Sequence, residues 1–466
     1  MLFNSYVFVL LFLPFVLGLW WSQRLSLSAR LLALTAASYL FYGWWDYRFV
    51  GLLAVSTLVD YVAGSQLYAA KSAGRRKFWL CVSLASNLGL LAFFKYSGFF
   101  AESWNVLADW LRTGGTMPVP EIILPVGISF YTFQTLSYSI DLYRGVAKPA
   151  KSLTHFAAYV SLFPQLIAGP IVRYGEIEDQ LNAIPSKVDW DRFAYGIFFF
   201  VVGMAHKILL ADTIAEKINP MFVDYSQLQL IGSWSAMIGY SVQLYFDFAG
   251  YSNMAVGLGM MLGFRFPQNF DSPYKSASIT DFWRRWHMTL SFWLRDYLFI
   301  PLGGSRGGQW LTLRNLVIVM FLGGLWHGAG WTFVLWGLYH GALLAVHAVI
   351  RRHTQWQIPI AINVIATFVL VVFGWAIFRS NDIYMCGSLW NSMIGLSGIE
   401  SDLLAAAGGI KQLGMLSVLM AVIWFCPNVW QIKFRPSPFY ALVLAGTFVL
   451  CVLRFDIQSP FLYFQF

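Results

Sequence analysis

Long apolar runs recur from one end of this 466-residue chain to the other, and short polar loops separate them. A helix needs about 20 mostly apolar residues to cross a bilayer, and because some runs are short or long for one span, we expect about ten to twelve crossings. The runs cover residues 1–21, 31–45, 49–70, 78–100, 122–143, 190–211, 231–263, 314–350, 361–379, 412–427 and 438–454.

Two stretches depart from this pattern. The segment "SLFPQLIAGPIVRY" (residues 161–174) is apolar but contains Pro164 and Pro170, which remove backbone donors and disfavour helix. Broken helix at membrane depth is tolerated only inside protein or beside a water-filled cavity, so a re-entrant segment is expected. Residues 264–313 are too rich in arginine to face lipid and predict interfacial helices. The expected fold is an all-α polytopic membrane protein, with one domain over 1–466.

Composition supports this class. Hydrophobic residues make up 58% of the chain and charged residues 11%, against about 25% charged in a soluble domain. The net charge of +9 arises in short loops between apolar runs, which the preference for positive charge on the cytoplasmic side explains. Membrane lipid is therefore the expected surrounding, and no nucleic-acid partner is predicted.

The early loops predict an orientation with the N-terminus outside. In that orientation nine basic residues fall in inside loops and two, Arg48 and Arg112, fall in outside loops. The inside residues are Arg24, Arg30, Lys71, Arg75, Arg76, Lys77, Arg144, Lys148 and Lys151.

His327 lies inside an apolar run, "FLGGLWHGAGWTFVLWG", that contains no charged residue. An ionisable side chain within a span is costly and indicates a functional site by default. Four glycines surround it (Gly323, Gly324, Gly328 and Gly330), although a helical glycine costs about 1 kcal/mol relative to alanine. This density indicates either close helix packing or space for a substrate. A neutral structural histidine, hydrogen-bonded to a neighbouring helix, is the alternative.

A second histidine, His287, lies in "SITDFWRRWHMTLSFWLRDYLF". If residues 281–297 form one helix with Thr280 as its N-cap, a polar stripe faces an aqueous cavity opposite an aromatic face. A plain interfacial helix with snorkelling arginines is the alternative. The stripe consists of Asp281, Arg284, His287, Ser291 and Arg295.

Asp247 shares a helical face with Gln243 and Tyr251, at spacings of four residues. A carboxylate this deep in an apolar run is expected to face the protein interior and to have a partner. The sequence leaves open whether Asp247 pairs with an arginine of residues 284–295 or takes part in catalysis. No metal-site spacing, nucleotide-binding glycine loop or nucleophile elbow appears.

Five segments, in order along the chain, strongly resemble the membrane-bound O-acyltransferases, in the branch that contains bacterial alginate O-acetyltransferases. The likeness runs from the first span to about residue 380, and its motifs concentrate in residues 122–350. The segments are "ILPVGISFYTFQTLSYSIDLYRG", "FPQLIAGPIVRY", "QLYFDFAGYSNMAVGLGMMLGFRFPQNF", "SITDFWRRWHMTLSFWLRDYLFIPLGG" and "RNLVIVMFLGGLWHGAGWTFVLWGLYHG".

The resemblance implies a role for each histidine. The family's hallmark histidine corresponds to His327, which is then the essential catalytic residue deep in a central tunnel, and its second histidine corresponds to His287. Acyl transfer from a thioester to a hydroxyl needs a general base whose pKa is near the working pH, which suits histidine. The candidate substrate-binding residues are Asp247, Arg284, Arg285, Ser291, Arg295 and Trp326.

The resemblance also implies acetyl-CoA as the cytoplasmic donor, with no tightly bound cofactor and no metal. Periplasmic acetyltransferase proteins are the implied partners, and they complete transfer to an exported polysaccharide, alginate or cellulose. The implied location is the bacterial inner membrane, with a periplasmic N-terminus. The charge pattern predicts a basic mouth for the phosphates of coenzyme A, formed by Arg265, Lys275, Arg284, Arg285, Arg295 and Arg306.

Other functions stay open at this point. A D-alanyl or peptidoglycan O-acyltransferase of the same superfamily is the main alternative, although the match in residues 281–304 favours the polysaccharide branch. A transporter is less favoured, because transporters often carry inverted repeats. No second copy of the break at Pro164–Pro170 appears in the chain.

Overall fold

The computed structural model describes all residues except 184, 186, 355–357, 456–460 and 463–466. Within the described residues the secondary structure is helical and contains no strand, which confirms the all-α prediction. The chain forms two compact units. Residues 1–200 and 254–267 form the first unit, and residues 201–253 and 268–466 form the second. The expectation of a single enzymatic domain stays a prediction.

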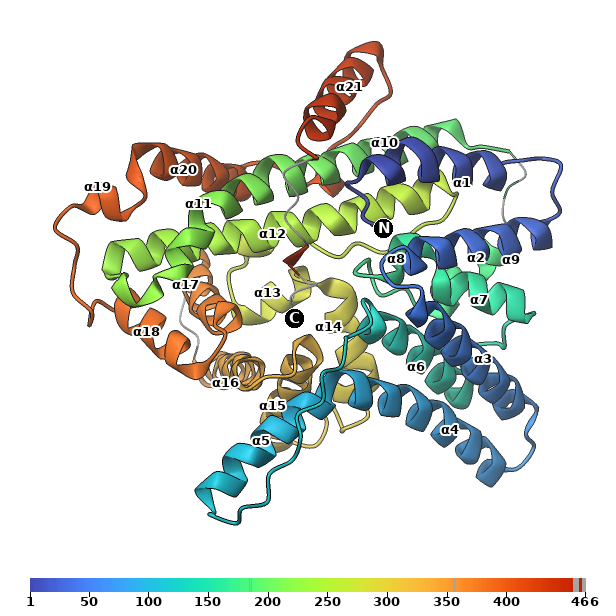
Figure 1. Ribbon diagram of the computed structural model, residues 1–466, viewed down its shortest axis with the longest axis horizontal. Coiled ribbons are helices and arrows are strands. Elements are labelled where there is room, and N and C mark those ends of the chain that lie inside the picture. The colour runs from blue at the N-terminus through green and yellow to red at the C-terminus, as the bar shows by residue number, and fades with distance from the viewer. Residues whose placement is uncertain (184, 186, 355–357, 456–460, 463–466) are drawn as a thin grey trace. The chain divides into compact units, whose positions relative to one another are not determined.

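The first unit is built from helices of the N-terminal half (Figure 1). It also receives the first part of α10 (Trp190–Ala205) and the end of α12 (Leu230–Met261). Its other elements are η1 (Val7–Phe12), α1 (Leu13–Trp20), α2 (Leu27–Gly43), α3 (Arg48–Ala69), α4 (Ala73–Leu91), η2 (Ala92–Tyr96), α5 (Ser97–Trp110), α6 (Ile128–Arg144), α7 (Leu153–Ser161), α8 (Phe163–Leu166) and α9 (Tyr174–Asn182).

A buried polar network joins α3, α4 and α6. Asp60 is fully buried on α3 and accepts hydrogen bonds from Ser83 Oγ (2.6 Å) and Asn87 Nδ2 (2.8 Å), both on α4. Thr135 of α6 donates to Asn87 Oδ1 at 2.8 Å. Buried polar groups must find partners inside the protein, and this network therefore fixes the register of three helices.

The predicted break around Pro164 is present and lies in the protein interior. Helices α7 and α8 are separated at Leu162, and the residues from Phe163 to Val172 are buried. Side chains satisfy the interrupted backbone: Ser38 Oγ accepts from the Phe163 amide (3.2 Å), and Gln165 Nε2 donates to the Tyr159 carbonyl (2.8 Å). The irregular backbone therefore finds hydrogen-bond partners inside the protein, which it needs because little water is present at membrane depth.

The second unit contains the remaining helices. They are η3 (His206–Ala211), α11 (Asp212–Val223), η4 (Tyr225–Gln227), most of α12, η5 (Pro273–Lys275), α13 (Ile279–Arg285), α14 (Met288–Leu294), η6 (Arg295–Phe299), α15 (Gln309–His327), α16 (Trp331–His353), α17 (Ile360–Arg379), α18 (Ile383–Met393), α19 (Leu403–Ala406), α20 (Gly409–Phe425), η7 (Val429–Gln431) and α21 (Pro438–Val452).

Helices α15 and α16 form a tightly packed hairpin in the second unit (Figure 1). A Cβ on Gly324 would lie 3.0 Å from the Gly337 Cα, and a Cβ on Gly341 would lie 3.0 Å from the Val317 Cα. Backbones approach this closely only where side chains are absent. Of the two explanations for the glycine density near His327, close helix packing is confirmed for Gly324.

Six described helical segments are long and apolar enough to cross a membrane, and the chain is therefore a multi-pass membrane protein. The number of crossings, expected to be ten to twelve, stays a prediction. The six are Arg48–Ala69, Ala73–Trp110, Trp190–Val223, Gln309–His327, Trp331–His353 and Ile360–Arg379, and shorter apolar helices occur at Val7–Trp20, Gly409–Phe425 and Pro438–Val452.

The N-terminus of α12 is capped from a distant loop by Glu400. Its carboxylate accepts hydrogen bonds from the amides of Gln229 (3.0 Å), Ile231 (2.9 Å) and Gly232 (2.9 Å). Burial opposes ionisation of this group, but the backbone amides that donate to it, chiefly Gly232 and Ile231, together outweigh that effect and lower the pKa of the Glu400 carboxyl. An anion at a helix N-terminus satisfies amides that have no partner within the helix.

We expect Glu400→Gln to destabilise the protein by about 1 kcal/mol, the usual worth of a helix cap. Because the folded pKa is depressed, this stabilisation is present above the unfolded pKa of about 4.3 and is lost as the pH falls through the folded value. Melting temperatures in detergent between pH 3 and 7 test this. The exposed Glu121→Gln is the matched control, and equal melting of the two variants at pH 7 would contradict the capping role.

Candidate active site

His327 is the last residue of α15 and lies at the tip of the α15–α16 hairpin. Its side chain is buried, and its ring lies edge-on to three aromatic rings: Trp336 (4.9 Å between centroids), Trp326 (5.0 Å) and Phe378 (5.5 Å). Rings from three helices therefore surround the imidazole. Such surroundings restrain its orientation and exclude bulk water.

A small cavity of about 20 Å³ borders His327. Room of this size accommodates about one water molecule. Its walls are mostly aromatic, so a reactive group in it would meet few water molecules. The lining residues are Leu244, Asp247, Phe248, Trp286, His327, Trp336, Trp375, Phe378, Phe461 and Leu462.

Asp247 lines the same cavity and belongs to a buried ionic cluster. Lys207 Nζ lies 2.7 Å from Asp247 Oδ1 and 2.6 Å from Asp212 Oδ1, and all three side chains are almost fully buried. The expectation that Asp247 faces the interior and has a partner is confirmed. The suggested pairing with an arginine of residues 284–295 is wrong, because Asp247 pairs with Lys207, which lies within the preceding apolar span Trp190–Val223.

The residues near the end of the chain complete the cavity. The Leu462 amide donates to Asp247 Oδ2 at 3.1 Å, and the Phe461 ring stacks on Tyr251 with centroids 4.7 Å apart. Gln243, Asp247 and Tyr251 do share one face of α12, as their spacing predicts, and Asp247 and Tyr251 contact these two residues. Phe461 and Leu462 were not predicted as site residues, since the apolar tail of the sequence carries no distinctive motif.

His287 does not lie within one continuous helix. Helix α13 ends at Arg285 and α14 begins at Met288, while His287 has left-handed backbone dihedrals (φ 44°, ψ 55°). The predicted helix over 281–297 is therefore wrong, and the N-cap is Ser278 rather than Thr280. A non-glycine residue in this conformation is strained and persists only where its surroundings hold it.

Asn269 holds His287 in this position. The Nδ1 atom of His287 lies 3.1 Å from Asn269 Oδ1, which also accepts from Thr289 Oγ1 (2.9 Å). Asn269 Nδ2 donates to Ser252 Oγ (3.0 Å), so the amide orientation is fixed and His287 Nδ1 is the donor. The His287 ring also contacts Trp326 (6.0 Å), which contacts His327 in turn. Trp326 therefore connects the two histidines.

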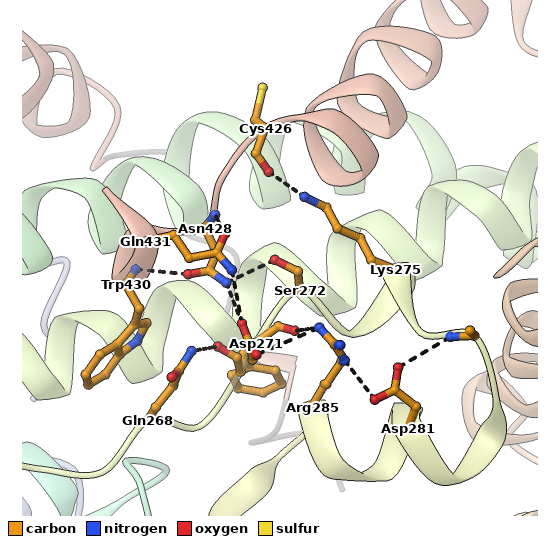
Figure 2. Close-up of polar contacts among 12 residues, drawn as sticks. Gln268, Asp271, Ser272, Lys275, Asp281, Arg285, Cys426, Asn428, Trp430 and Gln431 are labelled. Carbon is orange, nitrogen blue, oxygen red and sulfur yellow. Dashed lines mark hydrogen bonds and ion pairs between the residues drawn. The ribbon is translucent and has the colours of Figure 1, made fainter. Parts of the chain in front are cut away.

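The residues of the predicted basic mouth differ in their surroundings. Arg285 pairs with Asp281 (Nε–Oδ1, 3.0 Å) and lies 3.8 Å from Asp271, and Lys275 donates to the Cys426 carbonyl at 2.7 Å (Figure 2). Arg285 and Lys275 therefore make contacts within the protein. Arg284 is exposed, and the described residues provide it with no ion pair.

The other candidates are not among the residues that line the cavity beside His327. Arg295 is exposed and pairs with Asp296 at 2.6 Å, and Ser291 Oγ donates to the Trp286 carbonyl at 3.3 Å. Arg306 is exposed, and Arg265 belongs to the first unit. Their assignment to substrate binding stays a prediction.

Comparison with known proteins decides the family. The sequence profile of the membrane-bound O-acyltransferase family matches residues 146–387. The chain belongs to this family. It is 42% identical over 453 residues to a probable alginate O-acetylase (AlgI) of Azotobacter vinelandii, covering 96% of this chain and 87% of the relative. A probable alginate O-acetylase of Pseudomonas putida is 39% identical over the full length of both chains.

A peptidoglycan O-acetyltransferase of Helicobacter pylori is 36% identical over 431 residues, covering 86% of this chain and 81% of the relative. The segment that matches the O-acyltransferase profile contains both histidines and the ionic cluster, whereas Phe461 and Leu462 lie outside it. Lys207 and Asp212 were not predicted as site residues, although the sequence carried a signal for them. Both are charged residues within the apolar span Trp190–Val223, where a charge indicates a functional site.

We expect Lys207→Met to destabilise this O-acyltransferase by about 3–5 kcal/mol, since it leaves two carboxylates buried without their cation. Heating in detergent followed by size-exclusion chromatography measures the loss. Lys217→Met, an exposed position on α11, is the matched control. Adding Asp212→Asn and Asp247→Asn to Lys207→Met should recover part of the stability, and a Lys207→Met protein as stable as the wild type would contradict the cluster's role.

Proposed function

We propose that this membrane-bound O-acyltransferase takes acetyl groups from cytoplasmic acetyl-CoA and passes them across the inner membrane for O-acetylation of an exported polysaccharide, with His327 as the catalytic base. The observation that carries the proposal is the buried His327 at the edge of an aromatic cavity that Asp247 also lines. The two alginate O-acetylases and the peptidoglycan O-acetyltransferase among its relatives support acetyl as the transferred group.

In the proposed reaction His327 accepts one proton and later returns it. A ring nitrogen of His327 takes the proton of the acceptor hydroxyl while the oxygen of that hydroxyl attacks the thioester carbonyl. When the carbon–sulfur bond breaks, the imidazolium returns the proton to the coenzyme A thiolate, and the acetyl ester and the free thiol leave. Aromatic walls favour this transfer over hydrolysis, because they keep water from competing with the acceptor hydroxyl.

The positions of basic residues along the α15–α16 hairpin support a reaction in which donor and acceptor enter from opposite sides of the membrane. Arg306 and Arg314 lie at the start of α15, and Arg351 and Arg352 lie at the end of α16. Basic residues flank cytoplasmic ends of spans. The hairpin tip with His327 is then directed away from the cytoplasm, so the donor approaches from the basic end and the acceptor from the other.

Periplasmic acetyltransferase proteins are the proposed partners that complete transfer onto the polymer, because the acetyl group leaves this chain on the far side of the membrane. Alginate is the favoured polymer, since two of the relatives are probable alginate O-acetylases. Cellulose and peptidoglycan are the alternatives, and the acetylated polymer in the native host distinguishes them.

We expect His327→Ala, at matched membrane levels, to lower ester-linked acetate on the secreted polysaccharide by at least about a hundredfold, the lower range for loss of a general base. Cells lacking the native gene provide the background. His353→Ala, an exposed histidine at the end of α16, is the control and should retain acetate. Near-normal acetate in the His327→Ala cells would make His327 structural, and would move His287 to first candidate.

Arg284 and Arg285 provide a matched pair for the donor site. Removing the exposed Arg284 should raise the KM for acetyl-CoA by roughly fivefold, about 1 kcal/mol for an exposed ionic contact. Arg285→Ala should leave the KM unchanged, because that guanidinium is held by Asp281 and Asp271. Kinetics in proteoliposomes test both variants, and an unchanged KM for Arg284→Ala would exclude that residue from the donor site.

A further inference from the structure

An apolar groove of about 660 Å³ lies on the second unit, apart from the residues around His327. One wall is a face of α12 between Leu230 and Ile238, and the other is a face of α20 between Leu413 and Phe425. None of its lining residues borders the aromatic cavity. None borders the polar cavity of about 480 Å³ that meets the aromatic one at Leu462 and has Arg379 in its wall.

The polar groups in the groove lining already have partners inside the protein. Two indole N–H groups and two hydroxyls donate to backbone carbonyls at distances of 2.8–3.3 Å, and they belong to Trp234, Ser235, Ser417 and Trp424. A ligand therefore gains nothing here by bringing hydrogen-bonding groups. What the groove offers is apolar surface, and in a multi-pass membrane protein hydrocarbon is the ligand that matches it.

The groove is about as long as the hydrocarbon layer of one leaflet is thick. From Leu413 to Phe425 the helix advances by about 18 Å, and half of a bilayer's hydrocarbon core measures about 15 Å. Membrane helices associate mainly through small residues, whereas ten of the fourteen lining residues are Trp, Phe, Leu, Ile or Met. A flexible acyl chain adapts to such bulky walls more readily than a partner helix does.

A positive charge lies beside one end of the groove. Lys275 Nζ donates to the carbonyl of Cys426 at 2.7 Å, and Cys426 directly follows the lining residue Phe425 (Figure 2). Among the described residues no carboxylate lies within ion-pair distance of Lys275. An ammonium group has three donors, so Lys275 retains two for an anionic oxygen.

We propose that the groove binds one acyl chain of an anionic phospholipid, whose phosphate contacts Lys275 Nζ. The proposal goes beyond the proposed function, because the groove shares no lining residue with the cavity at His327. It also assigns Lys275 to a lipid headgroup and removes this residue from the basic mouth predicted for coenzyme A. The bound chain fills the space between α12 and α20 and so stabilises the packing of these two helices.

Lipid binding to the purified, delipidated full-length protein tests the charge contact. The probes are phosphatidylglycerol and phosphatidylcholine with identical acyl chains, and native mass spectrometry measures the bound lipid. We expect phosphatidylglycerol to bind about fivefold more tightly, as an exposed ionic contact predicts. Lys275→Gln should abolish this preference and Lys275→Arg should retain it. Lys411→Gln, at an exposed position of α20 outside the groove lining, is the matched control and should leave the preference unchanged.

A second pair of variants tests the groove itself. Ala421 is an exposed residue of the lining, and Ala421→Trp should fill the groove and weaken binding of both lipids at least about tenfold. Val418→Trp places the same side chain on α20 outside the lining and should bind like the wild type. Equal binding of the two lipids by the wild type, or undiminished binding by Ala421→Trp, would overturn the proposal. A wild type that binds neither lipid, but loses a co-purifying single-span protein in Ala421→Trp, would instead assign the groove to a partner helix.

Discussion

The site depends on one desolvated cation. Lys207 contacts Asp212 and Asp247 at 2.6 and 2.7 Å, and without this lysine the carboxylates of α11 and α12 would be buried without a counter-ion. Because Asp247 also accepts from the Leu462 amide, this contact connects η3, α12 and the residues near the end of the chain around one cavity. Charges in a water-poor interior persist only when geometry and hydrogen bonds compensate their desolvation, so these elements cannot shift independently.

Two cavities of opposite character meet at Leu462. The aromatic one restrains the His327 imidazole, whereas the polar one offers hydrogen-bond partners and a positive charge. The tip of the α15–α16 hairpin lies where they join, and its glycines allow the backbone to approach without side-chain bulk.

Hydrophobic pattern was sufficient to predict the all-α class, and the prolines and the four-residue spacing predicted the buried break at Pro164 and the shared face of Gln243, Asp247 and Tyr251. It also indicated His327 as an ionisable group in an apolar run. It did not predict the break at His287, because a left-handed residue held by Asn269 depends on a contact 18 residues away. The pairing of Asp247 with Lys207 and the cavity wall formed by Phe461 and Leu462 also depend on contacts between distant positions. For Lys207, its charge within the apolar span Trp190–Val223 was nevertheless a signal that the sequence carried.

The three-residue link Gly328–Gly330 between α15 and α16 has a consequence for biogenesis. So short a connection, with glycine contacts along the facing helices, leaves little freedom for one helix to enter the bilayer while the other waits in water. The two helices must therefore partition into the membrane as a preassembled pair, and His327 travels at its leading edge.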